Sequence, residues 1–181
     1  SKKSNVYLFV GLGFVGAGLL DGYHGIVTAE VFREFMPSDS SPLSVWSWFA
    51  SRLFLSVMLF MSWFGSNRKE IETFKYSEIN IYIFSTLFLF SSFLFFAFVQ
   101  LPAGYFPNLV GHRPQEFLPA LLFSLALIGY LKNGGWRNDA FEHWLVISLL
   151  VGIATQTFFM PFSSAVFDAD FDNAHLLKIV S

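Results

Sequence analysis

The sequence of 181 residues contains no cysteine. Disulfide bonds, thiolate-bound zinc, iron–sulfur clusters and cysteine nucleophiles are therefore excluded. Charge is also scarce, because only 13% of the residues are Asp, Glu, Lys or Arg and the formal net charge is −2. No basic stretch is dense enough to bind nucleic acid through its phosphates, so we expect no nucleic-acid partner.

The sequence contains no known catalytic motif in a suitable structural context. The sequence has no H-E-x-x-H motif, no phosphate loop and no convincing Ser-His-Asp arrangement. The stretch "GLGFVG" (11–16) matches G-x-G-x-x-G, but it lies inside an apolar run with no preceding strand. Its small residues predict the close approach of another helix instead. The N-terminus shows no cleavable signal, and we expect that this segment is not an enzyme.

What the sequence has in excess is apolar surface. Hydrophobic residues make up 54% of the chain, 25 residues are phenylalanine, and the mean hydropathy is +0.54. A soluble domain of this size cannot bury so much, which indicates a lipid environment. Runs of about twenty apolar residues predict five membrane spans, at Val6 to Thr28, Ser44 to Phe64, Ile79 to Gln100, Phe117 to Leu131 and Phe141 to Phe162.

A sixth span begins near Phe171 and is cut off at Ser181, because eleven residues rise only about 16 Å as a helix. The sequence thus predicts an all-α, polytopic transmembrane bundle with five complete spans and the start of a sixth. We expect residues 1–181 to form one domain that is truncated at its C-terminus. We also expect a further span to precede Ser1.

The distribution of cations predicts the orientation. The loops on the side of Ser1 carry seven cations, at Lys2, Lys3, Arg68, Lys69, Lys75, Lys132 and Arg137. The opposite loops carry Arg33 and Arg113. By the positive-inside rule the N-terminus is cytoplasmic, the loops at 29–43, 101–116 and 163–170 face outward, and the last helix runs inward.

Ionisable residues inside a membrane are costly and therefore indicate function. Six of them are predicted at a similar depth, near the outer ends of the first, second and last spans: Asp21, His24, Arg52, Asp172, His175 and Lys178. The segments "DGYH" (21–24) and "DNAH" (172–175) share the spacing Asp-x-x-His, which places both side chains on one helical face.

Three interpretations of these residues stay open. His24, His175, Asp21 and Asp172 form a four-ligand set that suits zinc, iron or manganese. His24 and His175 are alternatively axial ligands of a b-type haem, with Arg52 near a propionate. In the third interpretation Arg52 and Lys178 neutralise the two aspartates in a polar network that the histidines orient. A small ligand held by the same groups is a further alternative.

The other polar residues within or near the spans are weaker indications. His143 begins the fifth span beside interfacial aromatics, His112 is expected as an exposed loop residue, and Gln156 is expected to bridge helices. The phenylalanine run "FSTLFLFSSFLFFAF" (84–98) predicts a lipid-facing span.

Three segments carry a family resemblance: "GLGFVGAGLLDGYHGI", "WSWFASRLFLSVMLF" and the closing "FDNAHLLKIVS". With the stretch that starts at "HRPQEFLPALLFS", they resemble the membrane-associated sensor (MASE-type) domains of bacterial histidine kinases and diguanylate cyclases. The family positions fall on Asp21, His24, Arg52, Asp172, His175, Lys178 and Ser181. No kinase or cyclase domain is present in the sequence, although the resemblance implies that one follows.

The resemblance implies a sensory input module in the bacterial cytoplasmic membrane, which passes a signal through its last helix to a cytoplasmic effector. Its expected partners are the lipid bilayer and a signalling domain in cis or a partner membrane subunit, with a homodimer as a further expectation. The alternatives are a haem-binding electron-transfer subunit and a structural subunit of a membrane complex.

Overall fold

The computed structural model describes residues 2–67, 78–163 and 168–180. The described part of the chain is helical and contains no strand, which confirms the all-α prediction. The six α-helices are α1 (Lys2–Thr28), α2 (Ser40–Asn67), α3 (Glu78–Phe98), α4 (Phe117–Asn133), α5 (Ala140–Ala154) and α6 (Ala169–Val180). Short 3₁₀ or π segments join them: η1 (Glu30–Phe35), η2 (Pro114–Glu116), η3 (Gly135–Arg137), η4 (Thr155–Phe159) and η5 (Met160–Phe162).

Five stretches are long and apolar enough to cross a membrane, as predicted. They are Val6–Thr28, Ser41–Gly65, Glu78–Phe98, Pro114–Asn133 and Ala140–Phe162. The largest difference is in the fourth span, which begins at Pro114 rather than Phe117 because η2 leads directly into α4. Glu116, which the sequence places in an outer loop, is therefore inside a span.

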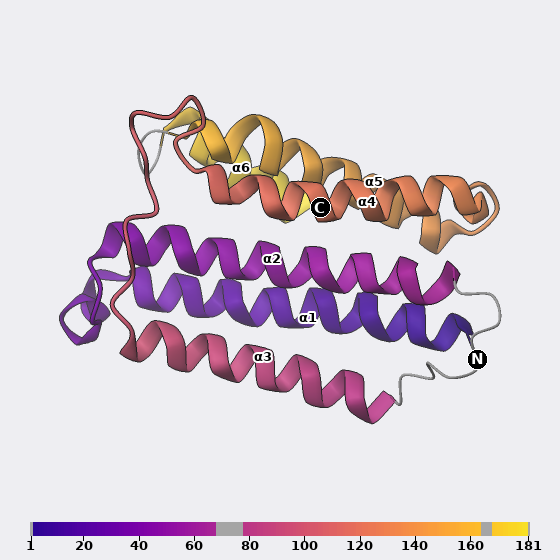
Figure 1. Cartoon of the computed structure of the whole chain (residues 1–181), viewed down its shortest axis with the longest axis horizontal. Helices are drawn as coiled ribbons and strands as arrows, with labels where there is room; N and C mark the ends of the chain where they lie inside the picture. The colour runs from indigo at the N-terminus through magenta and orange to yellow at the C-terminus, as the bar shows by residue number, and fades with distance from the viewer. Residues whose placement is uncertain (1, 68–77, 164–167, 181) are drawn as a thin grey trace.

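Successive spans run antiparallel and pack as an elongated bundle (Figure 1). Helices α1, α2 and α3 lie side by side, and α4, α5 and α6 cover the free side of α2. The segments 29–39 and 99–113 meet at one end of the bundle, and the N-terminus and η3 lie at the other. The predicted alternation of loops between two ends is therefore confirmed for the described loops.

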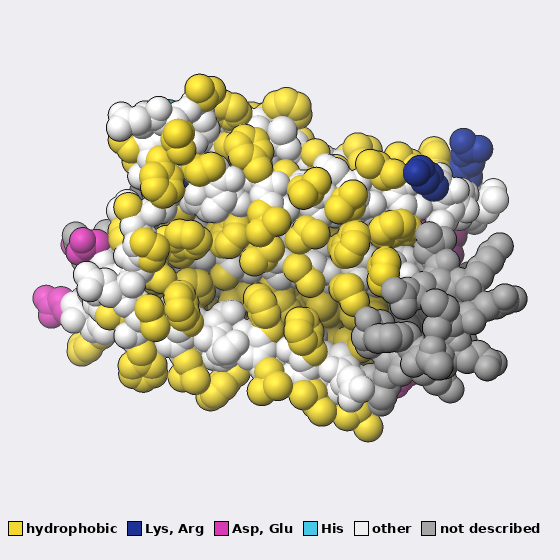
Figure 2. Space-filling model, viewed as in Figure 1, with side chains coloured by type: hydrophobic (Ala, Val, Ile, Leu, Met, Phe, Trp, Pro, Cys, Tyr) yellow, Lys and Arg dark blue, Asp and Glu magenta, His cyan; other side chains and the backbone are white. Residues whose placement is uncertain are grey.

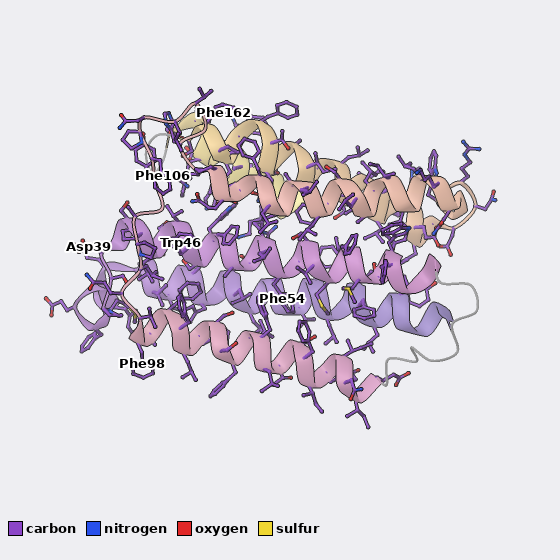
Figure 3. The ribbon with its side chains drawn as sticks, viewed as in Figure 1. Asp39, Trp46, Phe54, Phe98, Phe106 and Phe162 are labelled. Atoms are coloured by element: carbon purple, nitrogen blue, oxygen red, sulfur yellow. The ribbon has the colours of Figure 1, made fainter. Side chains whose placement is uncertain are left out.

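The surface between these ends is apolar (Figure 2). On the face shown, hydrophobic side chains cover the length of the bundle. Lys and Arg side chains stand at the end near the N-terminus, and acidic side chains are visible at both ends. Helix α3 is the most peripheral: 17% of its most apolar stretch is buried, compared with 67% for that of α2. Phe98 at its end points away from the bundle (Figure 3) and is 77% exposed, in line with the lipid-facing span predicted from the phenylalanine run.

Two of the small residues of α1 allow α2 to approach closely. A Cβ atom at Gly16 would overlap the ring of Phe54, and one at Gly13 would lie 3.0 Å from the Cβ of Met58. Gly11 and Gly18 have open space around them, so the predicted close approach holds for part of the "GLGFVG" region only. Phe54 is buried between the helices (Figure 3).

Capping interactions fix the turn between α4 and α5. Gly134 adopts the left-handed conformation with φ of 72°, and its N–H donates to the carbonyl of Tyr130. The carboxylate of Asp139 accepts a hydrogen bond from the N–H of Phe141 at 2.9 Å and caps α5. At the other end of the bundle, the Ser38 hydroxyl accepts from the N–H of Leu101 at 2.8 Å, which joins the two outer segments.

Candidate functional site

The carboxylate of Asp21 on α1 joins three helices. Its Oδ2 accepts a hydrogen bond from Nη2 of Arg52 on α2 at 3.1 Å, and its Oδ1 accepts from Nζ of Lys178 on α6 at 2.6 Å. The Arg52 and Lys178 side chains are 6% and 12% exposed. Such shielding strengthens the attraction between these charges and raises the cost of separating them.

The Arg52 guanidinium is held from a second direction. Nη2 also donates to the hydroxyl of Ser51 at 3.1 Å, and that hydroxyl donates to the carbonyl of Ala17 on α1 at 3.3 Å. Ser51 is fully buried. The ion pair is therefore tied to the backbone of α1, which limits how far Arg52 can move.

An indole ring forms the floor beneath both cations. Trp48 on α2 is 1% exposed, with Nζ of Lys178 4.0 Å and the guanidinium carbon of Arg52 5.7 Å from its ring centroid. Both distances are within the range of cation–π attraction. Trp48 also packs with Met160, Phe171 and Ala174, so the indole connects α2 to η5 and α6.

The two histidines, one from each Asp-x-x-His segment, both contact the ring of Trp48. The ring centroid of His175 lies 4.3 Å from that of Trp48, and the His24 ring makes an edge contact at 6.3 Å. His175 also packs on Phe171 with centroids 4.0 Å apart. The structure therefore brings both histidines to one aromatic cluster around Trp48.

Hydrogen bonds define which nitrogen of each imidazole carries a proton. Nδ1 of His175 donates to the carbonyl of Phe171 at 2.8 Å, since a carbonyl only accepts. Nδ1 of His24 lies 2.7 Å from the hydroxyl of Ser47, whose own proton is directed to the carbonyl of Leu43. His24 therefore donates as well, and Nε2 is the unprotonated nitrogen of each neutral ring.

The histidines have a tautomer that suits haem ligation, but their surroundings do not suit a haem. Unprotonated Nε2 atoms with donating Nδ1 atoms suit axial ligation. However, the buried indole of Trp48 lies against both imidazoles, and Arg52 is engaged by Asp21 rather than directed to a propionate.

The proposed four-ligand metal set is not assembled. Asp172 is exposed on α6, and Asp21 is occupied by two cations. Among the described residues, no group of three or more His, Asp or Glu side chains gathers in a metal-binding arrangement. Of the three interpretations, the geometry corresponds to the polar network, with Asp21 as its carboxylate and Asp172 outside it.

Two buried charges next to this network were not predicted. Arg113 is 4% exposed and Glu116 is fully buried, although both were expected in an outer loop. The backbone N–H of Arg113 donates to the carbonyl of Pro161, and its Nη1 lies 3.6 Å from Sδ of Met160. Burial lowers the pKa of Arg113, and the negative charges of Glu116 and Asp168 oppose that shift.

Glu116 is the most unusual of the buried groups. Neither of its carboxylate oxygens accepts a hydrogen bond from a residue that the structure describes. Three cations lie within electrostatic range: Arg113, Arg52 and Lys178. The only signal in the sequence was the pattern "HRPQEFLPA", in which a proline followed by an apolar run allows a helix to begin before the charge.

The remaining predicted positions lie apart from the network. His143 is exposed and stacks near Trp136 at 6.2 Å. His112 is half-buried beside Tyr105 rather than exposed, because the 99–113 segment folds back onto the bundle. Gln156 is fully buried in η4, and its amide has no hydrogen-bond partner among the described residues. Ser181 lies outside the described residues.

Comparison with models of protein families gives a match to the chain. Residues 1–181, the whole chain, match the family model MASE3, described as a membrane-associated sensor domain. No curated protein and no solved structure shows significant similarity to the chain.

Proposed function

This chain belongs to the MASE3 family of membrane-associated sensor domains, and we propose that it passes its signal through α6 to an effector in the cytoplasm. The effector is a signalling domain in cis, such as a histidine kinase or a diguanylate cyclase, or a partner membrane subunit. A bacterial cytoplasmic membrane is the proposed location.

The observation that carries this proposal is the attachment of α6. Lys178 reaches from α6 to Asp21 on α1 and lies over Trp48 on α2, while Phe171 and Ala174 pack with Met160 of η5. The position of α6 therefore depends on contacts with three parts of the bundle, α1, α2 and η5. A stimulus that alters one of these contacts changes the preferred position of α6, because it stabilises one packing arrangement over another.

The proposed orientation places the N-terminus and η3 in the cytoplasm. Lys132 and Arg137 are exposed at that end of the bundle, whereas Glu30, Glu34 and Asp39 are exposed at the other. Helix α6 starts at the acidic end and runs toward the basic end (Figure 1). A segment joined to α6 in that direction would enter the cytoplasm, where an effector would act.

Effector output tests the proposal. The chain is joined to its complete natural downstream region, and catalytic output is measured in membranes with Asp21→Asn and Lys178→Met. We expect either variant to change basal output by about tenfold, because a charge-assisted contact of about 1.4 kcal/mol sets that ratio. Asp172→Asn is the matched control, since its side chain is exposed and belongs to the same motif type.

Output that stays unchanged in both Asp21→Asn and Lys178→Met would contradict transmission through α6. Reporter fusions test the orientation separately: a reporter active only in the cytoplasm should be active after residue 135 and inactive after residue 107.

A further inference from the structure

The buried charges around α6 are unevenly shared. The charges of three cations, Arg52, Arg113 and Lys178, act on the carboxylates of Asp21 or Glu116, and Asp168 also acts on Arg113. Asp21 accepts from two of the cations, although its side chain is 26% exposed. Glu116 is completely buried and accepts a hydrogen bond from none of the described residues. The carboxylate that most needs a donor is therefore the one without it.

Two of the three cations are fixed by other contacts. Arg113 is held to η5 through the carbonyl of Pro161 and the sulfur of Met160. Arg52 is held between Asp21 and Ser51 and beside Trp48. The contact of Arg113 with Pro161 is made by the backbone N–H, and its Nη1 contacts Met160. Each guanidinium is planar and is held through its Nη atoms, while the buried Nε of each arginine has no hydrogen-bond partner among the described residues.

Lys178 differs from both arginines. Its ammonium group carries three donors on a flexible stem of four carbons, and it is attracted by Asp21 and by Glu116. It also belongs to α6, a helix that packs on α5, η4 and η5 and on Trp48 of α2. Lys178 can therefore exchange partners while Arg52 continues to neutralise Asp21.

We propose that Glu116 is a second acceptor for Lys178, so that α6 has two positions: one tied to α1 through Asp21, as in this structure, and one tied to η2, at the start of α4, through Glu116. In the second position the buried carboxylate gains a charge-assisted hydrogen bond, and Asp21 keeps its bond to Arg52. Trp48 lies beneath Lys178 in the first position and helps to hold it there. The two positions are the alternatives between which a stimulus selects, so this inference rests on the proposed function of α6.

The test measures the position of α6 directly. The chain has no cysteine, so spin labels can be placed on two introduced cysteines in the full chain in lipid nanodiscs. One pair joins α6 to α1 at Leu176 and Leu19, and the other joins α6 to α4 at Leu176 and Leu121. These side chains are 62%, 53% and 55% exposed, so the labels do not disturb the interior. Pulsed electron paramagnetic resonance then gives the distance distribution for each pair.

We expect Asp21→Asn to increase the population with the shorter α6–α4 distance, relative to the α6–α1 population, by about tenfold or more. The increase should vanish in Asp21→Asn combined with Glu116→Gln, and also in Asp21→Asn combined with Lys178→Met. Glu116→Gln alone should leave the unmodified distribution in place, because Lys178 then stays on Asp21. Asp172→Asn should reproduce the unmodified distances and serves as the control for the labelled protein.

Two results would overturn the inference. The first is no redistribution in Asp21→Asn. The second is a redistribution of equal size with and without Glu116→Gln, as expected if Glu116 were satisfied by water, by a bound proton or by Arg113 alone. Because the distances do not depend on the effector, an effector that ignores a confirmed redistribution would contradict the proposed function and leave the two positions established.

Discussion

Lys178 on α6 and Asp21 on α1 are joined by a hydrogen bond of 2.6 Å although 157 positions separate them in the sequence. The bond connects the first and the last helix of the bundle, and Arg52 of α2 shares the same carboxylate. We expect Asp21→Asn to lower the free energy of unfolding by about 3 kcal/mol, because it leaves two shielded cations without their counter-charge. Equilibrium unfolding of the chain in detergent micelles, followed by circular dichroism, measures this loss.

The other aspartate of the two Asp-x-x-His segments is the control for that prediction. Asp172 is exposed, so Asp172→Asn should change the free energy of unfolding by less than about 0.5 kcal/mol. Equal losses in the two variants would show that the ion pair is not what distinguishes Asp21.

Trp48 should contribute both packing and cation–π attraction. Trp48→Leu is expected to cost about 3 kcal/mol, because a fully buried indole is lost. In the presence of Lys178→Met the same substitution should cost about 1–2 kcal/mol less, since the cation–π contribution is already gone. The measurement is a double-mutant cycle of unfolding free energies.

Trp46 offers a comparison for this cycle. Trp46 also lies on α2, but its indole N–H donates to the carbonyl of Pro102 at 2.9 Å, away from Lys178. The cost of Trp46→Leu should therefore be the same with and without Lys178→Met. Additive costs at Trp48 would rule out its role beneath the cation.

The contact between α1 and α2 predicts opposite effects at two neighbouring glycines. Gly16→Ala should cost about 1–3 kcal/mol, because its Cβ would overlap the Phe54 ring. Gly18→Ala has no atom within 4 Å of the new Cβ and should stabilise the chain by up to about 1 kcal/mol through its better helix propensity. Thermal unfolding of the two variants measures these changes. A higher stability of Gly16→Ala would contradict the close packing of α1 and α2.

Haemin binding provides a prediction for the histidines. Haemin added to the purified chain is expected to give no Soret and visible bands of bis-histidine ligation, since Trp48 packs against His24 and His175. An absorption titration measures this, with His24→Ala and His175→Ala as controls. A low-spin spectrum that both variants abolish would restore the haem interpretation.

The spans and the three charged residues of the ion-pair network were predictable from the sequence for a physical reason. Lipid requires long apolar helices, and isolated charges such as Asp21, Arg52 and Lys178 must find partners at their own depth. The position of a residue within an apolar span predicts its depth in the membrane. It therefore indicated which residues meet, and the structure brings these three together.

Rotation about the helix axis and the exact starting point of a span were less predictable. Asp172 and His175 were expected to share a function, yet one is exposed and the other packs on Trp48, because helix packing and not spacing sets which side faces inward. Glu116 was missed since the apolar run begins after it, whereas η2 carries the helix back to Pro114. Trp48 was missed as well, because nothing in the sequence distinguishes a tryptophan that contacts two cations from any other tryptophan in an apolar run.

The wide turn of η4 has a consequence for the geometry of the whole site. A π segment holds one residue more than the equivalent stretch of α-helix, so everything after Thr155–Phe159 is offset in phase from the first part of α5. This offset is what directs Met160 toward Arg113 and Trp48, and a regular helix would turn it away by about 100°. Removing a single residue there would keep the length of the fifth crossing nearly intact, yet it would rotate the surface on which α6 rests.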